Sequence, residues 1–191
     1  MGGAGPGRGA PLNATHIAGL VAAAVLVFWA VGAYNRLVRL RSDITRAFAP
    51  VDAQIRQRHA LLLQWIEDLR ALHHEAPPVD SVHAACGQLQ AACDALRASP
   101  VAARAAVSLR LAEETLAGAR SRLTAEQPAK PELLARLGAE VLAEELAAAD
   151  STLGFARSQF NQATQAYNAA LHQFPTSIIA ELFRFSGAGT L

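Results

Sequence analysis

The sequence has few charged or aromatic residues and almost no cysteine. Only 17% of its 191 residues are charged and the formal net charge is +1, which argues against the basic surface that binds nucleic acid. The two cysteines, Cys86 and Cys93, are too few for a disulfide framework and lack zinc-ligand spacing, so we expect them to be buried and reduced. Aromatic residues make up 6% of the chain, and the Ala- and Leu-rich remainder favours helices over sheets.

Motifs for catalysis and for metal binding are also missing from the sequence. It contains no glycine-rich phosphate loop, no GxSxG nucleophile motif and no HExxH zinc motif. The nearest approach to a ligand cluster is His73-His74-Glu75 with His83, but neighbouring helical side chains point in different directions and do not converge on one ion. We therefore expect no enzymatic activity, no cofactor and no metal site.

One long hydrophobic run stands near the N-terminus. Residues 1–16 form a Gly- and Pro-rich arm that we expect to be disordered, and residues 17–34, from Ile17 to Tyr34, carry no charge. A helix of this length spans about 27 Å, close to the hydrocarbon thickness of a bilayer. Trp29 and Tyr34 lie at one end, where interfacial aromatic residues are expected. The run predicts a single transmembrane helix, with a signal peptide cleaved after Ala33 as the alternative.

The charges that flank this run predict its orientation. Only Arg8 precedes it, whereas four arginines and one aspartate follow it closely, the arginines being Arg36, Arg39, Arg41 and Arg46. The positive-inside rule then places the large domain in the cytoplasm, behind the inner membrane, with a periplasmic domain as the alternative. The lipid bilayer is thus an expected partner, and the same arginines are placed to attract anionic headgroups.

Beyond the run, apolar residues recur at alternating spacings of three and four, which is typical of helices packed as in a coiled coil. The pattern predicts an all-α fold, an elongated antiparallel bundle of three or four helices within residues 35–175. The expected helices cover about residues 35–75, 81–98, 100–124 and 132–174. Pro50 predicts a kink in the first helix, Asp80 or Ser81 the start of the second, and Ser99-Pro100 the start of the third.

The last expected helix has the most regular pattern. Large residues repeat every seven positions, opposite a seam rich in alanine: Leu146, Leu153, Phe160, Tyr167 and Phe174. Asn161 and Asn168 each follow a core aromatic residue, and we expect this polar edge to fix the register or to contact another helix. Pro175 ends the helix. The short apolar segment within 176–191 either packs across the end of the bundle, which we favour, or rests on the membrane interface.

Two charged residues of the first helix predict specific partners. Arg58 occupies a core position, where an unpaired cation is costly, so we expect it to meet a carboxylate or water inside the bundle. Asp52 and Arg56 are four residues apart and are expected to form a surface pair.

Two stretches of the chain resemble the LemA family of bacterial membrane-anchored proteins. The first stretch follows the hydrophobic run with the motif YNxLVxLR and a later basic segment, and its matching residues include Tyr34, Asn35, Leu40, Arg41, Asp52, Gln54 and Arg58. The second carries the motif YNxxxxxFP, and its matching residues include Asn161, Tyr167, Asn168, Phe174 and Pro175. The chain departs from the family at Phe48, where tryptophan is usual, and in residues 60–65, where the family proline is missing. The resemblance implies a helical bundle behind one transmembrane helix, without known enzymatic activity.

Two classes of function fit these observations. The first is a non-enzymatic scaffold or adaptor whose bundle surface binds a protein partner or a second copy of the chain. The second is a sensory domain that transmits a signal across the membrane through the continuous helix joining anchor and bundle. A sensor requires a ligand cavity, and the Ala-rich seams argue against a large one. Absence of any interior pocket near Arg58 would therefore count against this function.

Overall fold

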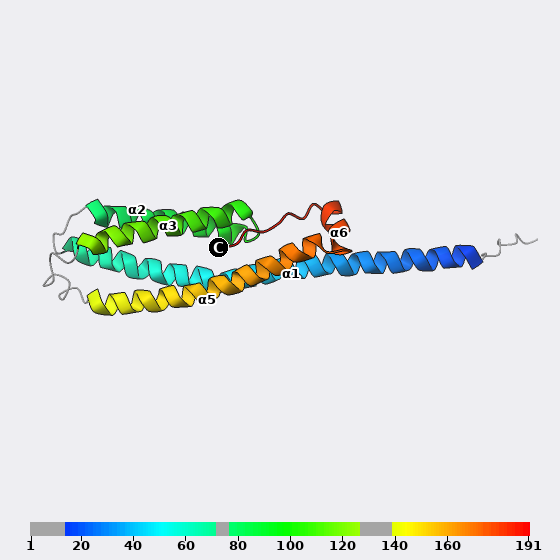
Figure 1. Cartoon of the computed structure of the whole chain (residues 1–191), viewed down its shortest axis with the longest axis horizontal. Coiled ribbons are helices and arrows are strands. Elements are labelled where there is room, and N and C mark those ends of the chain that lie inside the picture. The colour runs from blue at the N-terminus through cyan, green and yellow to red at the C-terminus, as the bar shows by residue number, and fades with distance from the viewer. Residues whose placement is uncertain (1–13, 72–76, 127–138) are drawn as a thin grey trace, which may run out of the picture.

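A computed structural model describes residues 14–71, 77–126 and 139–191, and within them the fold is entirely helical, as predicted. The helices are α1 (Ala14–Ala71), α2 (Pro77–Ala98), α3 (Ala103–Glu126), α5 (Ala139–His172) and α6 (Thr176–Leu182). Figure 1 shows an elongated rod in which the N-terminal part of α1 projects beyond all the other helices. That projecting part is apolar and almost uncovered by the rest of the protein, and α1 is the one described helix with the length and composition to cross a membrane.

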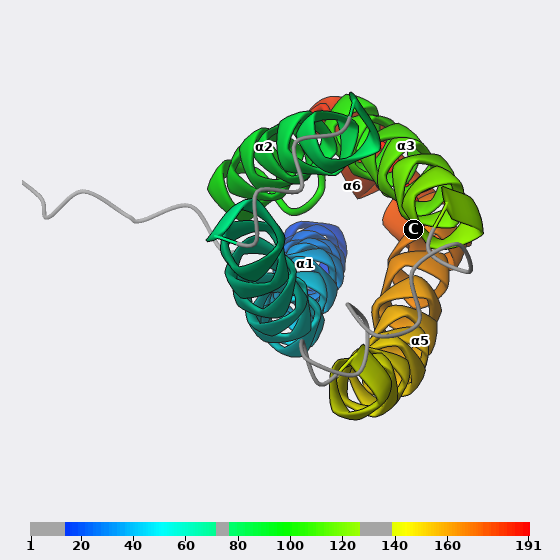
Figure 2. The same cartoon turned by 90° about the vertical axis from the view of Figure 1, so that its left-hand side faces the viewer.

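The bundle consists of two antiparallel helix pairs. α1 packs on α5, α2 packs on α3, and the contact between α1 and α2 joins the two pairs. Within the described residues, α3 and α5 do not pack directly on each other. Figure 2, which looks along the rod, shows the four helices arranged around a common axis with α3 and α5 as neighbours. The side of the bundle between α3 and α5 is therefore its least closed side.

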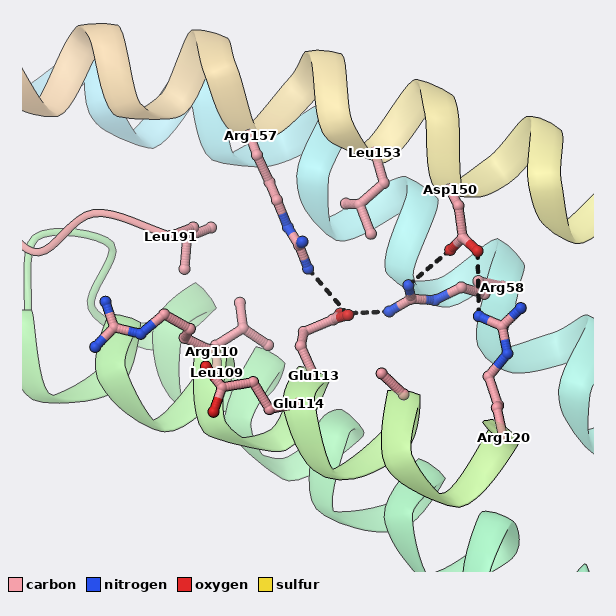
Figure 3. A pocket seen from close by; sticks show the side chains of 11 residues that line it. Arg58, Leu109, Arg110, Glu113, Glu114, Arg120, Asp150, Leu153, Arg157 and Leu191 are labelled. Atoms are coloured by element: carbon pink, nitrogen blue, oxygen red, sulfur yellow. Dashed lines mark hydrogen bonds and ion pairs between the residues drawn. The ribbon is translucent and has the colours of Figure 1, made fainter. Parts of the chain in front are cut away.

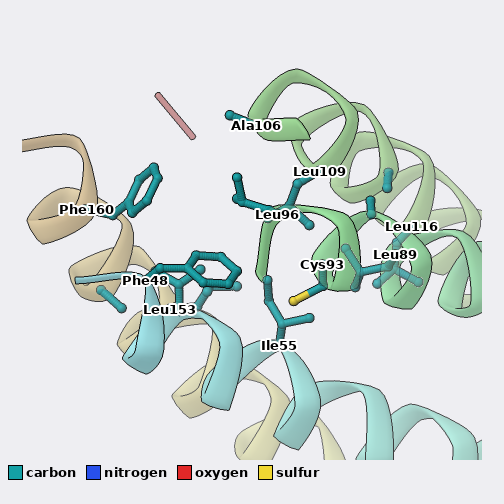
Figure 4. Packing of buried hydrophobic residues seen from close by; sticks show 14 of the residues in the cluster. Phe48, Ile55, Leu89, Cys93, Leu96, Ala106, Leu109, Leu116, Leu153 and Phe160 are labelled. Carbon is teal, nitrogen blue, oxygen red and sulfur yellow. The ribbon is translucent and has the colours of Figure 1, made fainter. Parts of the chain in front are cut away.

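The core is built by the predicted apolar stripes. Phe48 of α1 faces Phe160 of α5, Ile55 of α1 points toward α2, and Leu96 and Leu109 close the core from α2 and α3 (Figure 4). The rings of Phe48 and Phe160 lie 6.0 Å apart in an edge-to-face arrangement, which suits the quadrupoles of aromatic rings.

Both cysteines belong to this core. Cys86 and Cys93 are fully buried on α2 and are not joined in a disulfide. Burial raises the thiol pKa of Cys86 to about 11 and, together with a hydrogen bond to Asp52, that of Cys93 to about 12. Thiols in this state are poor nucleophiles, since the thiolate is the reactive form.

The prolines of α1 and α2 lie within or at the start of helices. α1 is one helix that includes Pro50. α1 also begins at Ala14, inside the arm expected to be disordered. α2 begins at Pro77 instead of near residue 80, because a proline in the first turn of a helix gives up only an N–H that has no intrahelical partner.

The start of the third helix also differs from the prediction. α3 begins at Ala103, and Pro100 belongs to a tight turn in which the Ala102 N–H donates to the Ser99 carbonyl over 2.9 Å. Three predictions lie outside the described residues. They are the end of the first expected helix at residue 75, the start of the last one at residue 132, and the cluster His73-His74-Glu75. Elsewhere in the described chain, no group of three or more potential metal ligands is found.

The C-terminal end of the bundle is closed by α6. Thr176, Ile179 and Ala180 are buried where α6 contacts α1 and α5, in agreement with the favoured packing across the bundle end. Phe174 was expected in the core seam but is 79% exposed, because α5 ends at His172 and the chain turns away there.

Candidate functional site

A cleft opens between α3 and α5, on the side where the backbones of these helices do not pack closely. Its volume is about 480 Å³, and a second hollow of about 200 Å³ adjoins it further along the same groove. The two hollows share Arg120 and Asp150, which lie between them. Arg58 of α1 forms the floor of the larger one (Figure 3), and Trp65, one heptad further along α1, lies at the floor of the smaller one.

Arg58 links the groove walls through a charged network. Its Nη1 donates to Asp150 Oδ1 of α5 over 2.9 Å and its Nη2 donates to Glu113 Oε1 of α3. Arg157 of α5 pairs with the second oxygen of Glu113 at 2.9 Å, and Arg120 of α3 pairs with the second oxygen of Asp150 at 3.2 Å. The prediction that Arg58 meets a carboxylate is confirmed, and the network joins three helices across a side without direct helix packing.

The electrostatics of the network favour its ionised form. Burial by itself would lower the pKa of Arg58, but the hydrogen bond and charge of Glu113, supported by Asp150, raise it. Burial likewise would raise the pKa of Asp150, but the hydrogen bond from Arg58 and the charges of Arg120 and Arg58 lower it below its usual value. Each carboxylate is thus held by two guanidinium groups.

The floor of the groove also carries hydrogen-bond donors without partners. Arg58 is only 5% exposed, yet its Nε–H meets no acceptor within the described residues, and the same holds for the indole N–H of Trp65. A buried donor without an acceptor is costly. A ligand or partner group that supplies a hydrogen-bond acceptor at the floor would satisfy these donors.

A second feature lies beside the cleft, where the C-terminal tail, residues 183–191, crosses from α6 to α3. The side-chain amide of Asn168 donates to the Ala188 carbonyl over 2.9 Å and accepts from the Ala188 N–H over 2.8 Å. Asn161 makes the same pair of bonds with Leu191, over 2.7 and 2.8 Å. The Tyr167 hydroxyl adds a bond to the Ser186 carbonyl over 3.1 Å.

The spacing of the two asparagines explains this arrangement. Seven residues of helix rise about 10.5 Å, and three residues of extended chain cover about 10 Å, so Asn161 and Asn168 match tail residues three apart. The tail runs antiparallel to α5, because the later asparagine binds the earlier tail residue. The polar edge predicted from sequence therefore contacts an extended segment of the same chain instead of another helix.

The tail also touches α3. A Cβ atom added at Gly189 would lie 2.8 Å from the Ala106 Cβ and 2.9 Å from the Ala103 Cα, so only glycine permits this approach. Leu191 at the end of the described tail lines the cleft beside Arg58. The tail thus fills the groove between α3 and α5 on one side of the cleft and bridges both walls.

Asp52 organises a separate ion cluster between α1 and α2. It pairs with Arg56 at 2.7 Å, as predicted, and it also accepts hydrogen bonds from Arg97 Nε and Cys93 Sγ, each over 3.2 Å. Burial by itself would raise the Asp52 pKa, but the hydrogen bonds from Arg97 and Cys93 lower it. Since Asp52 is itself buried, the pair is an element of helix packing and not the surface pair that was expected.

The remaining motif residues do not share one site. Tyr34 contacts Phe183 and Phe185 of the tail, with ring centroids 5.1 and 5.9 Å apart. Asn35 and Arg41 are exposed on α1, whereas Leu40 and Gln54 are partly buried there, and Pro175 is partly buried between α5 and α6. The groove residues Glu113, Arg120 and Asp150 lie outside these motifs and were not identified from the sequence.

A comparison with protein-family models matches the LemA family over residues 47–190. The match begins after the hydrophobic run, so the YNxLVxLR motif lies outside it, whereas Asp52, Gln54 and Arg58 and the whole YNxxxxxFP motif lie within it. No curated protein matches the chain. Because the family match covers well over half of the sequence, the chain belongs to the LemA family.

Proposed function

We propose that this protein is a non-enzymatic, membrane-anchored adaptor that binds a protein partner through the groove between α3 and α5. The supporting observation is the open side of the bundle, where charged side chains of α3 and α5 line two adjoining hollows above the buried Arg58 and Trp65. The larger hollow is lined by arginine, carboxylate and aliphatic side chains, among which there is no cysteine, histidine or serine to act as a nucleophile or base. Such a lining suits recognition better than catalysis.

Photo-crosslinking in native membranes tests this proposal. A photoreactive amino acid replaces Arg110 or Ala117, both exposed at the cleft, and the control replaces Gln88, which is exposed on α2 away from it. We expect both cleft positions to capture the same protein and the control position not to capture it. Capture of that protein equally from Gln88, or no specific adduct from either cleft position, would contradict the groove as the binding surface.

A ligand sensor is the second candidate function, and one observation favours it. A sensor requires a cavity, and a cleft of about 480 Å³ lies over Arg58, although the Ala-rich seams argued against a large one. α1 runs as one helix from the apolar segment to this floor, so a ligand that moved the groove walls would act on a rod that enters the membrane. A small-molecule adduct in place of a protein at Ala117 would favour this function over the adaptor.

For the side of the membrane, we propose that the bundle lies in the cytoplasm, from the arginines that follow the hydrophobic run. Ser151 is exposed on α5, far along the chain from the apolar segment, and Ser151→Cys introduces one reactive thiol beside the two buried, unreactive cysteines. We expect a membrane-impermeant thiol reagent to label this variant only after lysis of spheroplasts. The unsubstituted chain is the control and takes no label, whereas labelling of the variant before lysis would place the bundle outside the cytoplasm.

A further inference from the structure

The outer face of α6 is strongly apolar and uncovered. Ile178 and Leu182, four residues apart, point away from the buried side of the helix, and Phe174 and Phe183 flank them at its two ends. All four side chains are more than half exposed. Exposed large apolar residues that cluster in this way mark an interaction surface.

This face lies beside the apolar segment of α1. The Phe174 ring is 6.2 Å from the Trp29 ring, and the Phe183 ring is 5.1 Å from the Tyr34 ring. Figure 1 shows α6 next to α1 at the point where α1 leaves the bundle. The exposed apolar surface of the N-terminal segment therefore continues directly onto α6.

The length of the uncovered segment decides where the bilayer must end. The bundle begins to touch α1 at Trp29, and Ala33 is already buried against it. The free apolar stretch from Ile17 to Phe28 measures about 18 Å as a helix, well short of the roughly 30 Å hydrocarbon core. If α1 crosses the bilayer, the apolar layer has to extend toward Tyr34 and so reach the level of Phe174 and α6.

We propose that Phe174, Ile178, Leu182 and Phe183 form a membrane foot, a second contact that inserts into the boundary between lipid headgroups and acyl chains. The flanking arginines agree with a position at the headgroup boundary. Arg184 is exposed at the end of α6. Arg36 is the first charged residue after the apolar segment, and it donates to Gln173 over 3.2 Å. Arginine side chains of this kind extend toward headgroups while their stems remain in apolar surroundings. Glu181 lies at the edge of the foot, where it stays within reach of water.

The proposal of a membrane foot depends on the proposed membrane anchor, and one set of variants tests the two proposals separately. Single cysteines replace Ile178 and Leu182 in the full chain, with Val25→Cys inside the apolar segment as the positive control and Ser151→Cys as the negative control. Each variant is labelled with bimane and reconstituted into vesicles of phosphatidylethanolamine and phosphatidylglycerol. Quenching by spin-labelled lipid reports lipid contact, and quenching by iodide reports contact with water. The unsubstituted chain, with both cysteines buried, checks that the label is specific.

We expect lipid quenching at positions 178 and 182 comparable to that at position 25, and iodide quenching at position 151 alone. Lipid quenching at position 25 combined with iodide quenching at 178 and 182 would overturn the foot and leave the anchor intact. Protection of 178 and 182 from both quenchers would mean that a protein surface, such as a second copy, covers them, which also overturns the foot. Absence of lipid quenching at position 25 would overturn the anchor, and the foot with it.

Discussion

Replacement of Arg58 by alanine is expected to destabilise the bundle by about 3–5 kcal/mol, the usual cost of removing one partner from a buried ion network. The substitution leaves Glu113 and Asp150 on opposite walls of the groove without their shared cation, and it removes the link between α1, α3 and α5. Denaturant unfolding of the full chain in detergent, monitored by far-UV circular dichroism, measures the decrease in the free energy of unfolding.

The control for this experiment is Arg56→Ala. Arg56 lies on the same helix and also pairs with a carboxylate, but its side chain is 58% exposed, so we expect a loss of at most about 1 kcal/mol. A double replacement, Arg58→Met with Asp150→Asn, is expected to recover part of the stability lost in Arg58→Ala, because it removes one of the buried charges left behind. Equal effects of Arg56→Ala and Arg58→Ala would contradict the structural role of the network.

The effect of Arg58→Ala is also expected to depend on pH. The Asp150 pKa is lowered in the folded protein, so its ion pairs stabilise the fold above the unfolded-state pKa near 3.8, and this contribution disappears as the pH falls through the lower folded-state value. The difference between the unsubstituted chain and Arg58→Ala is therefore largest near neutral pH and shrinks below about pH 4. A difference that stayed constant from neutral to acidic pH would mean that Asp150 is not coupled to Arg58.

The second large effect is expected from the tail. The double substitution Asn161→Ala and Asn168→Ala removes four hydrogen bonds to Leu191 and Ala188. At about 0.5–1.5 kcal/mol for each hydrogen bond, the free energy of unfolding falls by about 2–6 kcal/mol if the tail remains in place. The decrease is smaller if the tail detaches and is solvated. Hydrogen exchange of residues 183–191 distinguishes these outcomes, because a detached tail loses its amide protection.

Two further variants make the tail experiment specific. Gln165→Ala lies between the two asparagines on an exposed position of α5 and is expected to change neither stability nor exchange. Gly189→Val introduces side-chain atoms where even a Cβ would approach Ala106 and Ala103 too closely, so it should release the tail from α3 while the asparagines remain. Unchanged exchange of the tail in both Gly189→Val and the double asparagine variant would contradict the described attachment.

The helices and their core could be predicted because they depend on periodicity. The heptad spacing predicts that Phe160 and Tyr167 are buried whichever helix packs against them, because a long helix of this kind must bury its apolar face. Arg58 was identified as needing a carboxylate for the same reason. The partners of Arg58 could not be predicted, because Glu113 and Asp150 lie 55 and 92 residues away in the sequence and no local pattern marks them.

The errors concern segments where local rules allow two answers. Pro77 and Pro100 are both compatible with a helix start, yet the chain uses one in the first turn of α2 and the other in a turn before α3. The tail has no periodicity to detect, and its contacts become visible only when the 10 Å spacing of Asn161 and Asn168 is compared with an extended chain. The polar edge was therefore predicted correctly, but its contact is with the extended tail and not with another helix.

The pairing of α1 with α5 has a consequence for synthesis of the protein. α1 leaves the ribosome first, but the helix that covers its apolar stripe, residues 139–172, is made only near the end of the chain. The α2 and α3 pair forms from neighbouring segments and closes early, whereas α1 has to wait for a contact of high sequence separation. Nascent chains that stall before residue 139 expose Ile44, Phe48 and Ile55 to solvent, which is the condition that promotes aggregation and recruits chaperones. Membrane insertion of the N-terminal segment during translation would hold such chains at the bilayer until the last helix arrives.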